Sequence, residues 1–188
     1  MDNKRELTNE LIAESLKELT QTMPFEKITI RMITEKAGVI RPTFYYHFQD
    51  KYETLEWIVG KQLLKGIDML LACGMFDEAA KMIFIRLWEE KEFYSKAFAI
   101  TGQNGFINIF IGEVYKLLAA RIGDAVRQYE KDVPLLDNSM VAKYFSVNLV
   151  VFASDWMLGK KSEISAEEMA DAYIYLLRHT YLELFGKE

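Results

Sequence analysis

The stretch that decides the fold is "TIRMITEKAGVIRPTFYYHFQDKYETL", residues 29–55. Two short segments with the apolar spacing of helices, about 30–37 and 42–48, meet at Gly38, where a tight turn favours a residue without a Cβ. Thr29 is placed to cap the first helix, and Pro42 suits the first turn of the second because its fixed φ is already helical. These features predict a helix-turn-helix.

The second helix of this unit has two unlike faces. If Phe44 and Phe48 point into a small core, the remaining side chains point mainly the other way. That outward set consists of Arg41, Thr43, Tyr45, Tyr46 and His47. Hydrogen-bond donors and flat rings suit the DNA major groove, where the second helix of a helix-turn-helix lies. The alternatives are that Tyr45 packs against the fourth helix, that His47 is a hydrogen-bonded surface histidine, and that Arg31 pairs with Glu35 at i,i+4.

The same stretch resembles the DNA-binding signature of the TetR-type transcriptional regulators, T-x-x-x-I-x-x-x-A-G-V-x-x-x-T-[FL]-Y-x-[HY]-F-x-x-K-x-x-L. The resemblance implies that Thr43, Tyr45, His47 and Lys51 contact the DNA backbone, and that Arg41 and Tyr46 stand at base-reading positions. The candidate DNA-binding residues are Thr29, Arg31, Arg41, Pro42, Thr43, Tyr45, Tyr46, His47 and Lys51. Many members have a serine where Ile40 stands, so the second helix is expected to lack a side-chain cap.

The composition indicates a globular chain, with 51% hydrophobic and 27% charged residues and a net charge of −5. A single cysteine cannot form an internal disulfide, and no apolar run is long enough for a membrane span, so we expect a cytoplasmic protein without a membrane partner. No metal-ligand spacing and no Gly-rich phosphate loop occurs. We therefore expect no metal, no cofactor, no catalytic residue and no enzymatic activity.

Helical periodicity continues through the rest of the 188 residues. The expected fold is all-α with about nine helices, near 4–22, 30–37, 42–48, 50–71, 77–89, 91–100, 106–131, 138–159 and 166–185. Ser165 and Glu168 form an S-x-x-E capping box at the start of the last helix. We expect a DNA-binding domain over 1–50, and a larger helical domain for regulation and dimerisation over 51–188.

The last two helices are apolar on more than one side, which predicts burial on more than one side. A second copy of the chain would supply one of those surfaces, and a regulator needs two recognition helices because one reads too few bases. The dimer-interface candidates are Val147, Val151, Trp156, Tyr173, Leu177 and Tyr181. The alternative is that both helices are core helices of a monomer.

An aromatic-rich section between these parts is the candidate effector site. Rings and a few polar groups suit a pocket for a small apolar or amphipathic molecule, although rings at helical spacing are also typical of plain core. The candidates are Phe84, Trp88, Tyr94, Phe98, Asn104, Asn108, Phe110 and Tyr115. This section resembles the C-terminal domains of a TetR-type subgroup that includes regulators of dihydroxyacetone kinase operons, in which a kinase-like protein partner can deliver the signal.

The favoured function is a homodimeric regulator that binds double-stranded operator DNA, a repressor released by a small-molecule effector. An activator or repressor controlled by a protein coactivator is the second hypothesis. A helical protein or enzyme that does not bind DNA is the third.

Overall fold

The computed structural model describes residues 2–121, 137–159, 163–179, 183–184 and 186. Within these residues the chain is helical with no strand, and nine helices have seven residues or more, so the predicted all-α fold is confirmed. No helix in this part is long and apolar enough to cross a membrane. The same residues contain no group of three or more His, Cys, Asp or Glu side chains placed to hold a metal.

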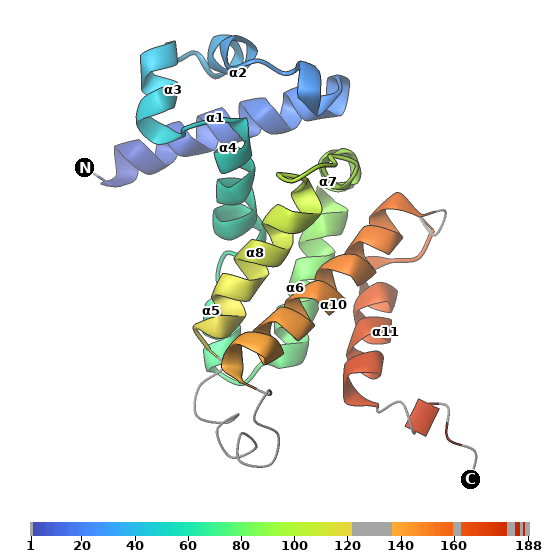
Figure 1. Ribbon diagram of the computed structural model, residues 1–188. Coiled ribbons are helices and arrows are strands. Elements are labelled where there is room, and N and C mark those ends of the chain that lie inside the picture. The colour runs from blue at the N-terminus through green and yellow to red at the C-terminus, as the bar shows by residue number, and fades with distance from the viewer. Residues whose placement is uncertain (1, 122–136, 160–162, 180–182, 185, 187–188) are drawn as a thin grey trace.

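The N-terminal helices form a head, at the top of Figure 1, from α1 (Asp2–Thr22), η1 (Phe25–Lys27), α2 (Ile30–Ala37) and α3 (Arg41–His47). Thr29 caps α2 as predicted, since its side chain accepts a hydrogen bond from the Met32 amide at 3.3 Å. Gly38 ends α2 with φ +66°, a left-handed conformation that favours glycine. The helix-turn-helix therefore follows from local signals that the sequence carries.

A broken helix connects the head to the body. We expected one helix over 50–71, but the structure has α4 (Lys51–Trp57), a π-helical segment η2 (Ile58–Leu63), and then α5 (Ile67–Ala72). The break falls at Gly66, whose φ is +75°. Arg86 stabilises it by donating hydrogen bonds to the carbonyls of Leu63 at 2.8 Å and Lys65 at 2.7 Å. The apolar spacing continues across the break, so periodicity did not reveal it.

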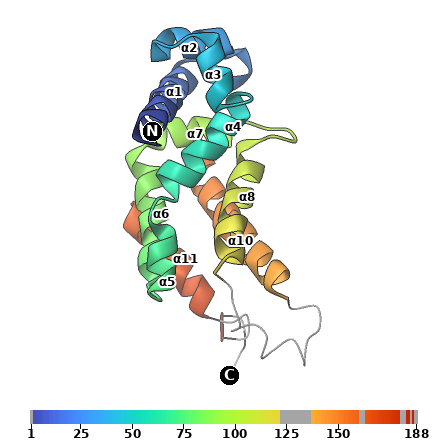
Figure 2. The same ribbon diagram turned by 90° about the vertical axis from the view of Figure 1, so that its left-hand side faces the viewer.

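The body consists of α6 (Phe76–Glu89), α7 (Lys91–Phe98), α8 (Phe106–Ala119), α10 (Asn138–Leu158) and α11 (Ala166–Arg178). Helix α8 packs on α10, α6 packs on α11, and α7 lies against α1 of the head (Figures 1 and 2). The predicted helix over 106–131 extends into 122–136, which lie outside the described residues.

The last helix begins as predicted and ends early. Ser165 and Glu168 form the capping box, with each side chain accepting from the other residue's amide. The helix was expected to reach 185 but ends at Arg178. His179 takes an extended backbone, and its Nδ1 lies 2.8 Å from the Tyr175 carbonyl, so the ring satisfies an acceptor at the helix end.

Head and body meet around a buried lysine. Lys17 of α1 forms ion pairs with Glu14 at 2.9 Å and with Glu90, between α6 and α7, at 2.6 Å. Its ammonium also lies 3.3 Å from Gln62 Oε1 of η2. Helix α4 packs on both α1 and α8, so it is shared by the two predicted domains, and the division after residue 50 stays a prediction.

Candidate nucleic-acid interface

Helix α3 presents the two faces that the sequence indicated. Phe44 is fully buried and Phe48 is 3% exposed, whereas Tyr45 is 51% and Tyr46 72% exposed. Arg41 is also exposed, and its Nη2 lies 3.5 Å from the Tyr45 hydroxyl. The outer face of α3 therefore carries the Arg41 guanidinium, the two tyrosine rings and the half-buried Thr43. Buried Phe44 and Phe48 hold the opposite face of the helix in the core.

The start of α3 lacks a side-chain cap. Ile40 occupies the N-cap position, is 68% exposed, and offers no acceptor to the first-turn amides. The helix begins at Arg41, so Pro42 is its second residue rather than its first. An N–H at position 42 would have had no partner inside the helix, and proline does not have one. Fewer first-turn amides are therefore left without a partner by the missing cap.

The α2 candidates already have partners within the head. The Thr29 side chain accepts from Met32, and the Arg31 guanidinium pairs with Glu35 at 2.7 Å. The hydrogen bond and charge of Glu35 raise the pKa of Arg31. The i,i+4 pairing that was the alternative for Arg31 is thus present, on an exposed surface beside α3.

The far end of α3 is held by α1. His47 Nδ1 lies 2.6 Å from Asn9 Oδ1, and the Arg5 guanidinium lies 5.7 Å from the centre of the Tyr46 ring. Burial, and then the nearby charge of Arg5, lower the pKa of His47. Sequence reasoning missed Asn9, because it is 38 residues from His47 and no local spacing connects them.

Lys51 binds backbone carbonyls of the head. Its Nζ donates to the carbonyls of Phe25 at 2.7 Å and Ile28 at 2.9 Å, and lies 4.5 Å from the Phe25 ring centre. Burial lowers the pKa of Lys51. The position that the signature assigns to a phosphate contact therefore ties η1 to the start of α4 in the free protein.

The effector candidates fall into separate groups. Tyr94, Phe98, Phe106 and Phe110 are at most 2% exposed and pack ring against ring, with Phe98 and Phe106 at 5.1 Å between centres. A second group joins Phe84, Trp88, Trp156 and Tyr173, in which the two indoles stack at 5.4 Å. Burial raises the pKa of Tyr94. Tyr115 is half-buried on α8.

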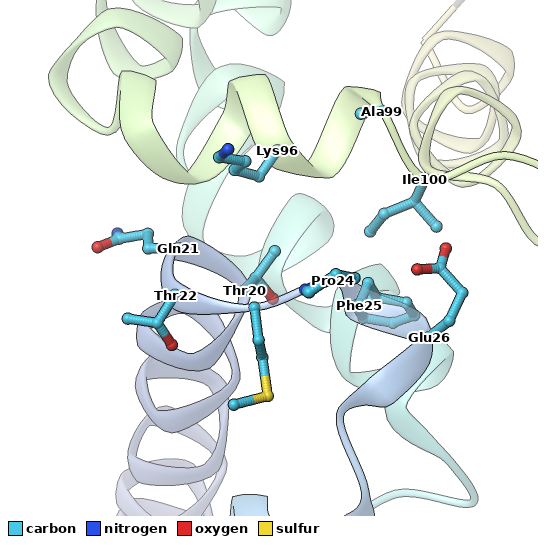
Figure 3. Close-up of a pocket in the computed structure, with 10 residues that line it drawn as sticks. Thr20, Gln21, Thr22, Pro24, Phe25, Glu26, Lys96, Ala99 and Ile100 are labelled. Carbon is cyan, nitrogen blue, oxygen red and sulfur yellow. The ribbon is translucent and has the colours of Figure 1, made fainter.

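The polar effector candidates lie elsewhere. Asn104 and Asn108 are exposed and line a depression of about 390 Å³ between α4 and α8, with Tyr52 and Glu56 on its other side. A second depression, of about 370 Å³, lies between the end of α1, η1 and α7, where Thr20, Phe25 and Lys96 face it (Figure 3). Both are at the junction of head and body, so the structure does not bring the aromatic and amide candidates into one cavity.

The dimer candidates also divide. Trp156 and Tyr173 are 2% and 6% exposed and belong to the core of a single copy. Val147, Val151 and Leu177 are exposed, and other exposed apolar side chains lie on the same two helices: Met140, Tyr144, Phe145, Leu158, Tyr175 and Leu176. Tyr181 lies outside the described residues.

Comparison with known proteins identifies the head. Residues 12–56 match the family model described as "Bacterial regulatory proteins, tetR family". The match covers the head, and the chain resembles regulators of the TetR type. The protein described as "HTH-type dhaKLM operon transcriptional activator DhaS" from Lactococcus lactis subsp. lactis (strain IL1403) is 26% identical over 138 residues, 73% of each chain. The predicted resemblance to the TetR type, and to its dihydroxyacetone-kinase-operon subgroup, is thereby confirmed.

Two solved structures share the fold of this chain. One is "Dihydroxyacetone kinase operon activator DhaS", with a TM-score of 0.61, 22% identity, and coverage of 90% of this chain and 93% of that one. The other is Thermus thermophilus FadR, a TetR family transcriptional repressor in complex with lauroyl-CoA, with a TM-score of 0.60, 17% identity, and coverage of 90% and 92%.

Replacing Lys51 by Met should destabilise the folded protein by about 1–3 kcal/mol, because the partly buried carbonyls of Phe25 and Ile28 lose a charged donor. Urea unfolding with and without the substitution measures this difference. Lys27→Met, an exposed lysine of η1, is the matched control and should change the free energy of unfolding by less than about 0.5 kcal/mol. Equal stability of the wild type and Lys51→Met would show that the carbonyl contacts contribute nothing.

Proposed function

We propose that this regulator binds operator DNA as a homodimer, with the outer face of α3 in the major groove. The exposed set on α3, held by buried Phe44 and Phe48, carries the proposal. An arginine such as Arg41 can bridge O6 and N7 of guanine, and hydroxyls such as that of Tyr45 can bind phosphates. The proposed role requires no catalytic residue, and we assign none.

The homodimer is supported by the exposed apolar side chains of α10 and α11. Val147, Val151 and Leu158 recur along one side of α10, and Leu177 adds to them from α11. Apolar side chains gathered on neighbouring helices are typical of a protein-protein interface. A two-fold dimer also supplies the second recognition helix that a half-site pair in DNA requires.

Two kinds of control are candidates for this dimer. A repressor released by a small apolar molecule agrees with the lauroyl-CoA complex of FadR, but such a molecule would have to separate rings that pack against one another in this body. An activator or repressor controlled by a protein partner needs no such cavity. The ring packing and the activator named among the relatives favour this second candidate.

The first test is selection of DNA from a random pool, followed by a salt titration of the selected duplex. If each subunit makes about four phosphate contacts, the dimer makes about eight, and log K against log salt should have a slope near −7. Fluorescence anisotropy measures both the affinity and the slope. Recovery of no preferred sequence, together with binding that salt does not weaken, would contradict the proposal.

Arg41→Ala should relax the preference at one base pair in each half-site, at a cost of about 1–3 kcal/mol for the preferred base. The measurement is the affinity for duplexes that carry each of the four base pairs at that position. Equal weakening on all four would instead make Arg41 a phosphate contact.

Val151→Asp should convert the dimer into a monomer, because it places an unpaired charge in the proposed interface. Val151 is 45% exposed in one copy, so the substitution should leave the fold of that copy intact. Sedimentation velocity measures the change. Met69→Asp on α5, 69% exposed, is the matched control away from α10 and α11 and should remain dimeric; a dimer that survives Val151→Asp would exclude this surface.

A further inference from the structure

The contact between α1 and the last turn of α3 determines which nitrogen of His47 carries a hydrogen. His47 Nδ1 lies 2.6 Å from Asn9 Oδ1. An amide oxygen can only accept a hydrogen bond, so the shared hydrogen belongs to Nδ1. In a neutral imidazole only one nitrogen is protonated, so Nε2 is left as an acceptor.

This tautomer cannot donate to DNA as it stands. A phosphate oxygen is also an acceptor, and two acceptors that face each other repel. A neutral His47 bound to Asn9 is therefore the wrong form for a phosphate contact. Protonation of Nε2 by solvent changes that nitrogen into a charged donor, whose hydrogen bond to phosphate is about twice as strong as a neutral one.

We propose that Asn9 is a positioning residue for DNA binding: it holds His47 in the Nδ1–H tautomer, so that His47 contacts a DNA phosphate only after Nε2 has bound a proton. The inference rests on the proposed function, in which the outer face of α3 contacts DNA. If His47 must be protonated to contact phosphate, DNA binding by this chain is coupled to the uptake of one proton per subunit from solvent.

Burial and the charge of Arg5 favour the neutral form of His47 in the free protein. Charged groups from four elements line the depression of about 350 Å³ that His47 borders: Arg5 from α1, Glu53 and Glu56 from α4, Lys61 from η2, and Glu113 from α8. Burial is the main cause that lowers the pKa of His47, and the charge of Arg5 adds to it. The pKa of His47 in the free protein therefore lies below its ordinary value of 6.5, which favours the neutral imidazole.

The sign of the pH dependence follows from this. A bound phosphate favours the imidazolium, so the pKa of His47 is higher on DNA than in free protein. The DNA affinity that protonated His47 contributes is then complete below the pKa of His47 in the free protein. It is lost as the pH rises through the pKa of His47 in the DNA complex. Between the two pKa values, binding takes up one proton per subunit. Each subunit then changes the association constant for DNA by up to about tenfold per pH unit.

The first measurement reads the tautomer without DNA. The chain has two histidines, so ¹⁵N-labelled imidazoles give two resolvable sets of NMR signals, assigned with His179→Gln. We expect the Nδ1–H form for His47 in the wild type and a shift toward Nε2–H in Asn9→Ala. His179, whose Nδ1 lies 2.8 Å from the Tyr175 carbonyl, is the internal reference and should not change. An Nε2–H form in the wild type, or an unchanged tautomer in Asn9→Ala, would overturn the inference.

Asn9→Asp is the conservative variant, because a carboxylate still accepts from Nδ1 and also favours the imidazolium. We expect it to keep the Nδ1–H tautomer and to move the NMR titration of His47 to higher pH. A merely structural role for Asn9 would predict no such directed change. A His47 titration that stays at the wild-type pH in this variant would contradict the proposal.

The second measurement is the affinity of the 188-residue chain for its selected duplex between pH 8 and pH 5.5. Wild-type affinity should rise as the pH falls, and His47→Gln should lose that dependence. Asn9→Ala should show a smaller dependence, since its freed imidazole can donate from Nε2 without an added proton. Binding of the wild type and Asn9→Ala with equal pH dependence overturns the inference alone, whereas no DNA binding at any pH overturns the proposed function with it.

Discussion

The burial of Phe44 and Phe48 is the constraint on which the proposed DNA-binding surface depends. A helix as short as α3 has little stability of its own in water, so its orientation is set by what it packs against. The two rings lie in the core that α1, α2 and α4 share, which fixes the rotation of α3 about its axis. Tyr45 and Tyr46 are exposed because they lie on the other side of the helix from these two rings.

Helix α1 supports this arrangement along its whole length. Near its start, Arg5 and Asn9 contact the end of α3, and in its middle Ile12 and Leu16 are fully buried in the core of the head. Next to Leu16, Lys17 forms an ion pair with Glu90 of the body. One helix thus supplies the contacts that orient the outer face of α3 and the contact that ties the head to the body.

The sequence predicted features whose causes are local. The cap at Thr29, the left-handed Gly38 and the capping box at Ser165 each depend on residues within one turn, and all three appear in the structure. The break at Gly66 was missed because Arg86, which binds the freed carbonyls, is about twenty residues away in sequence. The carbonyl contacts of Lys51 and the Asn9 contact of His47 were missed for the same reason. On α10, periodicity identified apolar residues, but it did not show that Trp156 faces its own body whereas Val151 is exposed.

The ion pairs of the buried Lys17 with two partly exposed glutamates have a consequence for how head and body are joined. Burying the charge of Lys17 costs desolvation free energy, which its partners must offset. Two apolar surfaces can slide over one another with little loss of contact. The Lys17 ammonium instead keeps its three partners, Glu14, Glu90 and Gln62, in only one arrangement of α1, η2 and the junction of α6 and α7. A rotation of α1 that separated Lys17 from Glu90 would leave a buried charge short of a partner. We interpret the pair as what fixes the angle at which the body holds α1, and through α1 the direction in which α3 faces.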